Sequence, residues 1–277
     1  MHFEQLQVGD TVRSAPRVLS RADVDAMAAF NAATGLMGTA ENTETDQIPH
    51  SLLVILAADL AVEADLFGAE LVSVDAGGWT VHSPVRVKDE LTLTSTIVRL
   101  RPTPENGCGL ATVERTLLRN GDEGPQLVLS GSTVASVAAT GADRCICRDV
   151  GTEAWGNALA DRLSAQAAFS SSVSSWDGTI GLRGGADEIH LRVYRGAIIE
   201  VTRRTPLGPT FTMGTTDALW ADIFNTPRLR FGTRVMLGQF EIQGNAYEYL
   251  RLIKAMELIV QTAWAMARHD GSDEPAC

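Results

Sequence analysis

Ile48-Pro-His-Ser-Leu-Leu-Val-Ile-Leu56 is the stretch that decides the fold of the N-terminal half. Its last five residues, Leu52 to Leu56, are all apolar. Successive residues of a helix point to different sides, so this run predicts a helix buried on every side. We expect the Ser51 hydroxyl to cap the helix, which would end near Phe67-Gly68. A helix of this kind needs other elements wrapped around it.

Four strand-like runs follow the apolar helix, and turn residues separate them. In the second run threonines alternate with residues that are mostly apolar, as in Leu91-Thr-Leu-Thr-Ser-Thr-Ile97. This alternation predicts an antiparallel sheet with two different faces, and hence an α+β fold. The expected strands are Trp79–Val87, Leu91–Leu100, Leu110–Arg119 and Gln126–Val137.

Two further elements are expected before the apolar helix. Val12 to Leu19 can extend as a first strand. Ser20 with Asp23 three positions later is the signature of a capping box, and predicts a helix that starts there. Gly35 is a plausible end for that helix.

Residues 1–140 resemble the MaoC-like hydratases and dehydratases, whose hot-dog fold wraps an antiparallel sheet around one central helix. The resemblance is carried by Phe3-Glu-Gln-Leu-Gln-Val-Gly-Asp10, Ser20-Arg-Ala-Asp-Val24, Phe30 through Gly35, and Ile48-Pro-His-Ser-Leu-Leu53. It implies a hydrophobic small-molecule or acyl-type substrate. Hot-dog modules generally pair sheet edge to sheet edge, so a homodimer is expected.

The catalytic pair of that family is altered in this sequence. MaoC-like hydratases carry an Asp directly after the glycine that corresponds to Gly35, and a His five positions beyond the Asp. Here those positions are Leu36 and Glu41. A leucine cannot transfer a proton, so hydration by the family mechanism is not expected.

Asp46 and His50 are the nearest substitutes for the missing pair. A carboxylate beside an imidazole raises its basicity, while a helix N-terminus favours the neutral ring. An imidazole tuned close to neutrality could act as acid or base. The alternative is that His50 only caps or orients the helix, with Asp46 exposed in a polar loop.

Other polar or aromatic residues of this half are candidates for substrate binding. Glu41, Trp79 and His82 are included, although a solvated carboxylate, a core tryptophan and a water-facing histidine are the alternatives. Asp59 interrupts the apolar helix, and a buried carboxylate would need a partner such as Arg86 or Arg115. The alternative is that Asp59 emerges at a dimer interface.

The pattern restarts after a polar connector, residues 141–152. Helical spacing is found from Trp155 to Phe169, from Thr216 to Phe224 and from Tyr247 to Arg268. Ile189 to Tyr194 alternates strictly, which places His190 on a solvated sheet face. Further strands are expected at Trp176–Leu182, Ala197–Thr202, Thr210–Gly214 and Gly238–Asn245.

Residues 153–270 resemble sterol carrier protein 2, an α/β domain in which sheet and helices enclose an apolar tunnel, and 271–277 form a tail. The resemblance is carried by Tyr194-Arg-Gly196, Phe211-Thr-Met-Gly-Thr215 and Gly238-Gln-Phe-Glu-Ile-Gln-Gly244. Six apolar residues could line such a tunnel or form plain core. They are Phe211, Met213, Trp220, Phe224, Phe240 and Trp264.

Composition limits the partners. The 277 residues are 45% hydrophobic and carry a net charge of −11, which argues against nucleic acid and anionic membranes. The longest apolar run is too short to span a bilayer, and no secretory signal is visible, so a cytoplasmic protein is expected. The four cysteines are expected to be reduced, and neither a metal-ligand cluster nor a cofactor motif is present in the sequence.

Three functions stay open. The first is a repurposed hot-dog enzyme that acts without cofactor on a hydrophobic acyl or polyketide-like intermediate, by cyclisation, isomerisation or an unusual dehydration. The second is a lipid or acyl carrier without catalysis. The third is an enoyl-thioester hydratase or dehydratase with a relocated catalytic pair.

Overall fold

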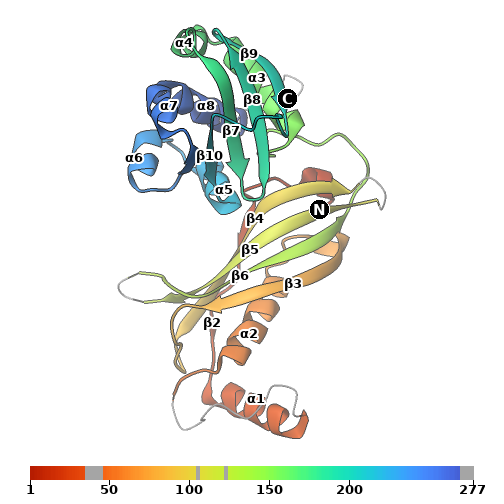
Figure 1. Ribbon diagram of the computed structural model, residues 1–277. Helices are drawn as coiled ribbons and strands as arrows, with labels where there is room; N and C mark the ends of the chain where they lie inside the picture. Colours follow the sequence, from red (N-terminus) through yellow and green to blue (C-terminus); the bar gives the residue numbers. More distant parts are fainter. Residues whose placement is uncertain (35–45, 104–106, 122–123, 269–277) are drawn as a thin grey trace. The chain divides into compact units, whose positions relative to one another are not determined.

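The structure, a computed structural model, describes residues 1–34, 46–103, 107–121 and 124–268 (Figure 1). The chain forms two compact units, each with its own sheet. The first unit is Met1–Leu6 with Asp10–Ala142, and the second is Gln7–Gly9 with Asp143–Cys277. Cys108 carries a free thiol, whereas Cys147 is in a disulfide bond, so the prediction of reduced cysteines is wrong at Cys147.

The sheet of the first unit is antiparallel, with strand order β1-β4-β5-β6-β3 and with β2 also paired to β4. The predicted strand from Val12 to Leu19 is wrong in extent, because Pro16, which has no N–H to donate, separates β1 from β2. The edge strand β3 starts at Leu71 rather than at Trp79. The strands are β1 Thr11–Arg13, β2 Arg17–Val18, β3 Leu71–Val81, β4 Glu90–Thr103, β5 Cys108–Asn120 and β6 Gln126–Ala138.

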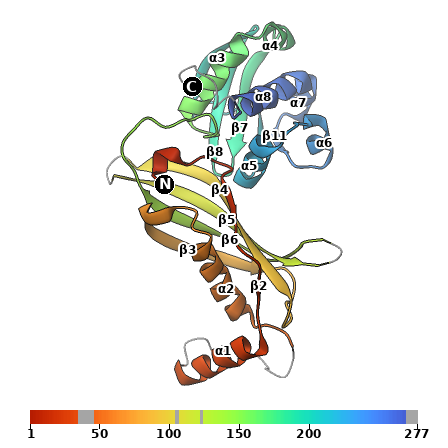
Figure 2. The ribbon, with the colours of Figure 1, turned by 180° about the vertical axis from the view of Figure 1, so that it is seen from behind.

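Helix α2, His50–Glu63, packs against one face of this sheet (Figures 1 and 2). Leu53, Ala57 and Leu60 are fully buried and belong to one core cluster with Leu91 and Leu117. The predicted hot-dog arrangement is confirmed. Three details are wrong. Pro49, not Ser51, is the cap residue, and the helix ends at Glu63 rather than near Phe67. Ile55 is 40% exposed, because the sheet covers only one side of the helix.

Helix α1, Arg21–Thr34, begins as predicted. The Ser20 N–H donates to Asp23 Oδ2 at 2.7 Å, and the Asp23 N–H donates to Ser20 Oγ at 3.3 Å, which is the reciprocal bonding of a capping box. Gly35, the predicted end, lies outside the described residues. Two short 3-10 helices, η1 Phe3–Gln5 and η2 Gly68–Glu70, complete the unit.

The second unit has a mixed sheet in the order β11-β10-β7-β8-β9. Strands β10 and β7 are parallel, and the other neighbouring pairs are antiparallel. Helix α3 packs against β8, β9 and α8, and α7 packs against β10 and β11 (Figures 1 and 2). The strands are β7 Asp177–Gly184, β8 Asp187–Tyr194, β9 Ala197–Thr202, β10 Phe211–Thr215 and β11 Glu241–Gly244.

The helices of the second unit are shorter than the sequence predicts. The expected helix from Tyr247 to Arg268 is interrupted at Leu252, whose backbone leaves the helical region with φ −101° and ψ 16°. The one expected from Trp155 to Phe169 is interrupted at Gln166. Helix α6 has no counterpart among the expected helices. The helices are α3 Glu153–Ser164, α4 Ala167–Ser172, α5 Asp217–Asn225, α6 Phe231–Met236, α7 Ala246–Arg251 and α8 Ile253–Met266.

Candidate functional site

The segment that leads into α2 is held by a short backbone pairing. The Ile48 N–H donates to the Val85 carbonyl at 2.8 Å, and the Val87 N–H donates to the Asp46 carbonyl at 2.7 Å. Gln47 and Arg86 form the β-bridge between these bonds. The pairing fixes the backbone from residue 46 to 48, and so it holds both Asp46 and His50 close to the N-terminal end of α2.

Both predicted catalytic side chains are exposed. Among the interactions of the described residues, no hydrogen bond or ion pair joins the Asp46 carboxylate to the His50 imidazole. A carboxylate orients and supports an imidazole through a direct bond, so the structure places two separate groups here rather than a dyad. The first turn of α2 contains no acidic residue, and its cap makes no side-chain hydrogen bond.

The three predicted binding residues of this unit differ in their surroundings. Glu41 lies outside the described residues, as does Leu36. Trp79 is partly buried and packs against the core cluster. His82 is exposed, and its Nε2 is 2.7 Å from Ser130 Oγ.

A set of polar side chains that sequence reasoning did not assemble lies on the α2-facing side of the sheet. Ser95 on β4 is opposite Arg115 on β5, and Thr133 on β6 is opposite Val113, two positions from Arg115. Residues two apart on a strand share a face, so these three have the same orientation as the core residues Leu93 and Leu117. We name Ser95, Arg115 and Thr133 the polar row.

The polar row consists of two buried hydroxyl residues and the partly buried Arg115. Ser95 and Thr133 are only 3% and 4% exposed. Ser95 Oγ, Arg115 Nε and Thr133 Oγ1 are inaccessible to solvent and have no hydrogen-bond partner among the described residues. Burial lowers the pKa of the Arg115 guanidinium, since desolvation disfavours its charged form. Buried polar groups are normally hydrogen-bonded, so three neighbouring exceptions require an explanation.

The predicted partners of Asp59 were wrong. Asp59 is exposed and lies 3.8 Å from Arg17 Nη1, while Arg17 also bonds Glu63. Asp59 needs no buried partner, because it projects from the uncovered side of α2. Arg115 is therefore not neutralised by this carboxylate. The signal for the polar row in the sequence was Ser95, a polar residue on the otherwise apolar face of its strand.

The predicted tunnel residues of the second unit lie within its core. Phe211, Met213, Trp220, Phe224 and Phe240 are buried. Trp220 contacts Phe224 and Phe240, with ring centroids 5.7 and 6.3 Å apart. Trp264 is partly buried, and its Nε1–H donates to the Thr226 carbonyl at 3.1 Å. The structure thus brings Trp220, Phe224 and Phe240 into one aromatic cluster.

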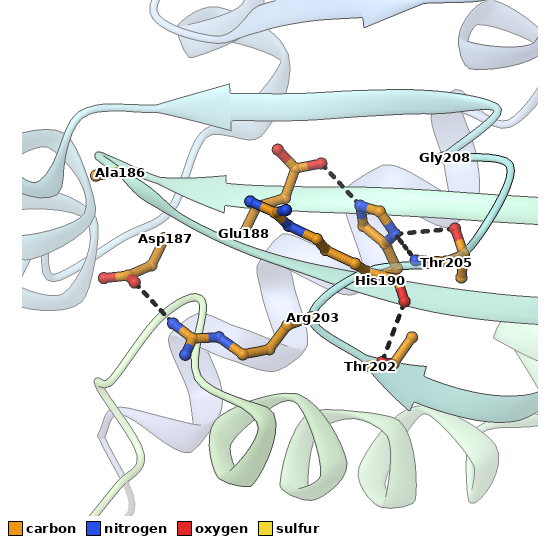
Figure 3. Close-up of a pocket in the computed structure, with 9 residues that line it drawn as sticks. Ala186, Asp187, Glu188, His190, Thr202, Arg203, Thr205 and Gly208 are labelled. Atoms are coloured by element: carbon orange, nitrogen blue, oxygen red, sulfur yellow. Dashed lines mark hydrogen bonds and ion pairs between the residues drawn. The ribbon is translucent and has the colours of Figure 1, made fainter.

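The prediction that His190 lies on a solvated face was wrong. The side chain is buried, with 5% of the residue exposed, because the segment after β9 folds over it. The Thr205 N–H donates to His190 Nδ1 at 3.0 Å, so the proton is on Nε2, which donates to Glu188 Oε1 at 3.1 Å (Figure 3). Glu188 Oε1 also accepts from the Thr212 hydroxyl at 2.9 Å. Alternation alone could not show this covering segment.

His190 and Glu188 border an open cavity of about 910 Å³ in the second unit, together with Asp187, Thr202 and Arg203 (Figure 3). Arg203 is paired with Asp187 at 3.1 Å. Both ring nitrogens of His190 are used in bonds within the protein, and the cations and carboxylates around it are balanced. This arrangement stabilises the turn after β9, and it leaves the imidazole without a nitrogen for a ligand.

The described part of the chain offers no metal site and no membrane span. Among the described residues, no group of three or more His, Cys, Asp or Glu could hold a metal ion. None of the helices described is long and apolar enough to cross a membrane.

No protein-family model and no curated protein sequence matches this chain. Similar solved structures include a MaoC-like dehydratase from Rhodospirillum rubrum, with 17% identity and a TM-score of 0.40, which covers 51% of this chain and 99% of that one. An (R)-hydratase from A. caviae has 21% identity and a TM-score of 0.36 over 48% and 97% of the two chains. A sterol carrier protein 2 has 20% identity and a TM-score of 0.36 over 42% and 98%. These proteins are of the two kinds that the sequence resembles, and the likeness is one of fold.

Proposed function

We propose that this protein binds a hydrophobic acyl or polyketide-like small molecule in its hot-dog unit and rearranges it without a cofactor. Isomerisation, cyclisation and an unusual dehydration are the reactions that fit. The observation that carries the proposal is the open N-terminal end of α2, where the exposed His50 imidazole stands at the start of an apolar helix.

The groups at this end of α2 suit proton transfer on an apolar substrate. Imidazole is the side chain whose ordinary pKa lies closest to neutrality, so it can donate or accept a proton at working pH. A helix N-terminus stabilises negative charge that develops nearby, as on the oxygen of an enolate. An apolar wall that holds a flexible chain in its reactive fold removes a large part of the entropic barrier.

Variants of the two polar residues test the proposal. We expect His50→Ala to lower turnover of enoyl thioesters or linear polyenes by about 100-fold or more, the range for loss of a general acid or base. Asp46→Asn should have a smaller effect, because its carboxylate is not bonded to the ring. His2→Ala, which removes another imidazole of the same unit, is the control. Unchanged turnover in His50→Ala would rule out this site.

A carrier without catalysis is the second candidate. The observation that favours it is the absence, among the described residues, of a bond between Asp46 and His50 that would form a dyad. Direct binding of the same compounds, followed by calorimetry alongside the turnover assay, separates the two functions. Binding that is retained in every variant, with no turnover by the wild type, would establish the carrier.

A further inference from the structure

We propose that the polar row of Ser95, Arg115 and Thr133 binds the carboxylate of the ligand, so that the substrate is a hydrophobic carboxylic acid. This inference rests on the proposed function, because it names the substrate class of the same hot-dog unit. It departs from the thioester substrates of hydratases, whose acyl carbonyl carries no formal charge.

The donors of the polar row match an anionic oxygen. A guanidinium offers only N–H donors, and each hydroxyl can turn its hydrogen toward an acceptor. A carboxylate is acceptor-only and can receive several such bonds at once. A neutral carbonyl could accept one or two of these bonds, but it would leave the charge of the partly buried Arg115 without compensation.

No described acidic side chain serves as the counter-ion of Arg115. Glu114 is its neighbour on β5 and so faces the opposite side of the sheet. Asp75 pairs with Val134, the neighbour of Thr133, and therefore also faces that side. Arg115 is partly buried, and its inaccessible Nε has no partner among the described residues. A negative charge beside it would offset the cost of removing this cation from water, which is what a bound anion supplies.

The surroundings of the polar row indicate the rest of the ligand. The pair Ser95 and Arg115 is flanked on the same face by two apolar cross-strand pairs. One pair is Leu93 with Leu117 and the other is Ile97 with Val113, and all four residues are almost completely buried. Gly131 on β6 is opposite Arg115 on β5 and, on its other side, opposite Trp79 on β3. A ligand whose carboxylate reaches the polar row is thus bordered by apolar side chains, which suits a hydrocarbon body and excludes a second charge.

Binding of a matched acid and ester tests the inference. The probes are trans-2-decenoate and its methyl ester, measured by isothermal calorimetry with the full-length protein at pH 7. We expect the wild type to bind the acid at least about 10-fold more tightly than the ester, and Arg115→Met to weaken acid binding about 10- to 150-fold while leaving ester binding unchanged. Ser95→Ala and Thr133→Val, which keep the charge, should each weaken acid binding about 2- to 13-fold.

The control is Arg13→Met, which removes an exposed arginine from β1 of the same unit. Circular dichroism confirms that each variant is folded, and the two hydroxyl variants carry the test if Arg115→Met is not. Equal binding of acid and ester by the wild type, or acid binding that survives Arg115→Met, would overturn the carboxylate site. Binding of neither probe would overturn it as well.

The two proposals fail in different ways. Turnover that depends on His50 without any preference for the acid would overturn the carboxylate site and leave the proposed reaction standing. Acid binding that depends on Arg115, together with turnover that is unchanged in His50→Ala, would support the carboxylate site and refute the catalytic assignment.

Discussion

Gly131 is the residue that allows Trp79 to lie over the sheet of the first unit. The two residues face each other across β3 and β6. A β-carbon added at Gly131 would come within 2.5 Å of the indole ring. The absent side chain therefore provides the space that the tryptophan fills.

We expect Gly131→Ala to destabilise the protein by about 1–3 kcal/mol, because the indole must move away from a well-packed position. Thermal unfolding with tryptophan fluorescence measures the effect. Gly78→Ala is the matched control, since its added carbon has no neighbour within 4 Å. Equal loss of stability in both variants would contradict the packing argument.

His190 and Arg115 are both polar residues in sheet interiors, yet they differ in kind. Both nitrogens of His190 have partners within the protein, through Thr205 and Glu188. Arg115 Nε has none among the described residues. Replacing a satisfied group costs stability, whereas replacing an unsatisfied one costs binding, so we interpret His190 as structural and Arg115 as functional.

At the scale of secondary structure, α1 and α2 begin in different ways. The start of α1 is capped by the reciprocal hydrogen bonds of Ser20 and Asp23. The start of α2 has Pro49 as its cap residue, with no side-chain bond. An uncapped start leaves the helix dipole available, which is what a site at His50 requires.

We expect Ser20→Ala to loosen α1 by about 1 kcal/mol, measured by hydrogen exchange of its amides. Ser51→Ala in the first turn of α2 should have no such effect and is the control. The bonds from Ser20 lower the pKa of Asp23 below its ordinary 3.8. The cap therefore stabilises α1 above about pH 3.8 and loses strength as the pH falls through the lower pKa of the folded state. Protection of the α1 amides that stays constant down to pH 2 would contradict this role of Asp23.

At the scale of the whole molecule, the edge strand β3 exposes an apolar surface. Leu71, Val72 and Val74 are 41%, 61% and 43% exposed at the end of the sheet order. Free strand edges with apolar side chains promote pairing with another chain. We therefore expect two copies to pair through β3.

Light scattering at micromolar concentration should give twice the chain mass of 29.6 kDa. Val72→Lys should shift the protein toward the monomer, because a buried lysine opposes edge pairing. Leu207→Lys, which changes a fully exposed leucine of the second unit, is the control. A monomeric mass for the wild type would refute the pairing.

Much of the fold could be predicted because it depends on local patterns. The capping box at Ser20, the alternation of β4 and the apolar run of α2 each reflect bonds or spacing within a few residues. The interruption at Leu252 could not be predicted, since neither Gly nor Pro marks it and tertiary packing decides it. The uncovered side of α2 at Ile55 was missed for the same reason.

The sequence by itself determined the two-unit organisation and the hot-dog arrangement, because periodicity is a property of the chain. Only the tertiary structure decided which polar groups are buried together. Ser95, Arg115 and Thr133 are on three different strands, and strand register alone makes them neighbours. Register also places Glu114 on the opposite face of the sheet from Arg115. Which charged side chains lie on the α2-facing side is therefore decided by the folded sheet.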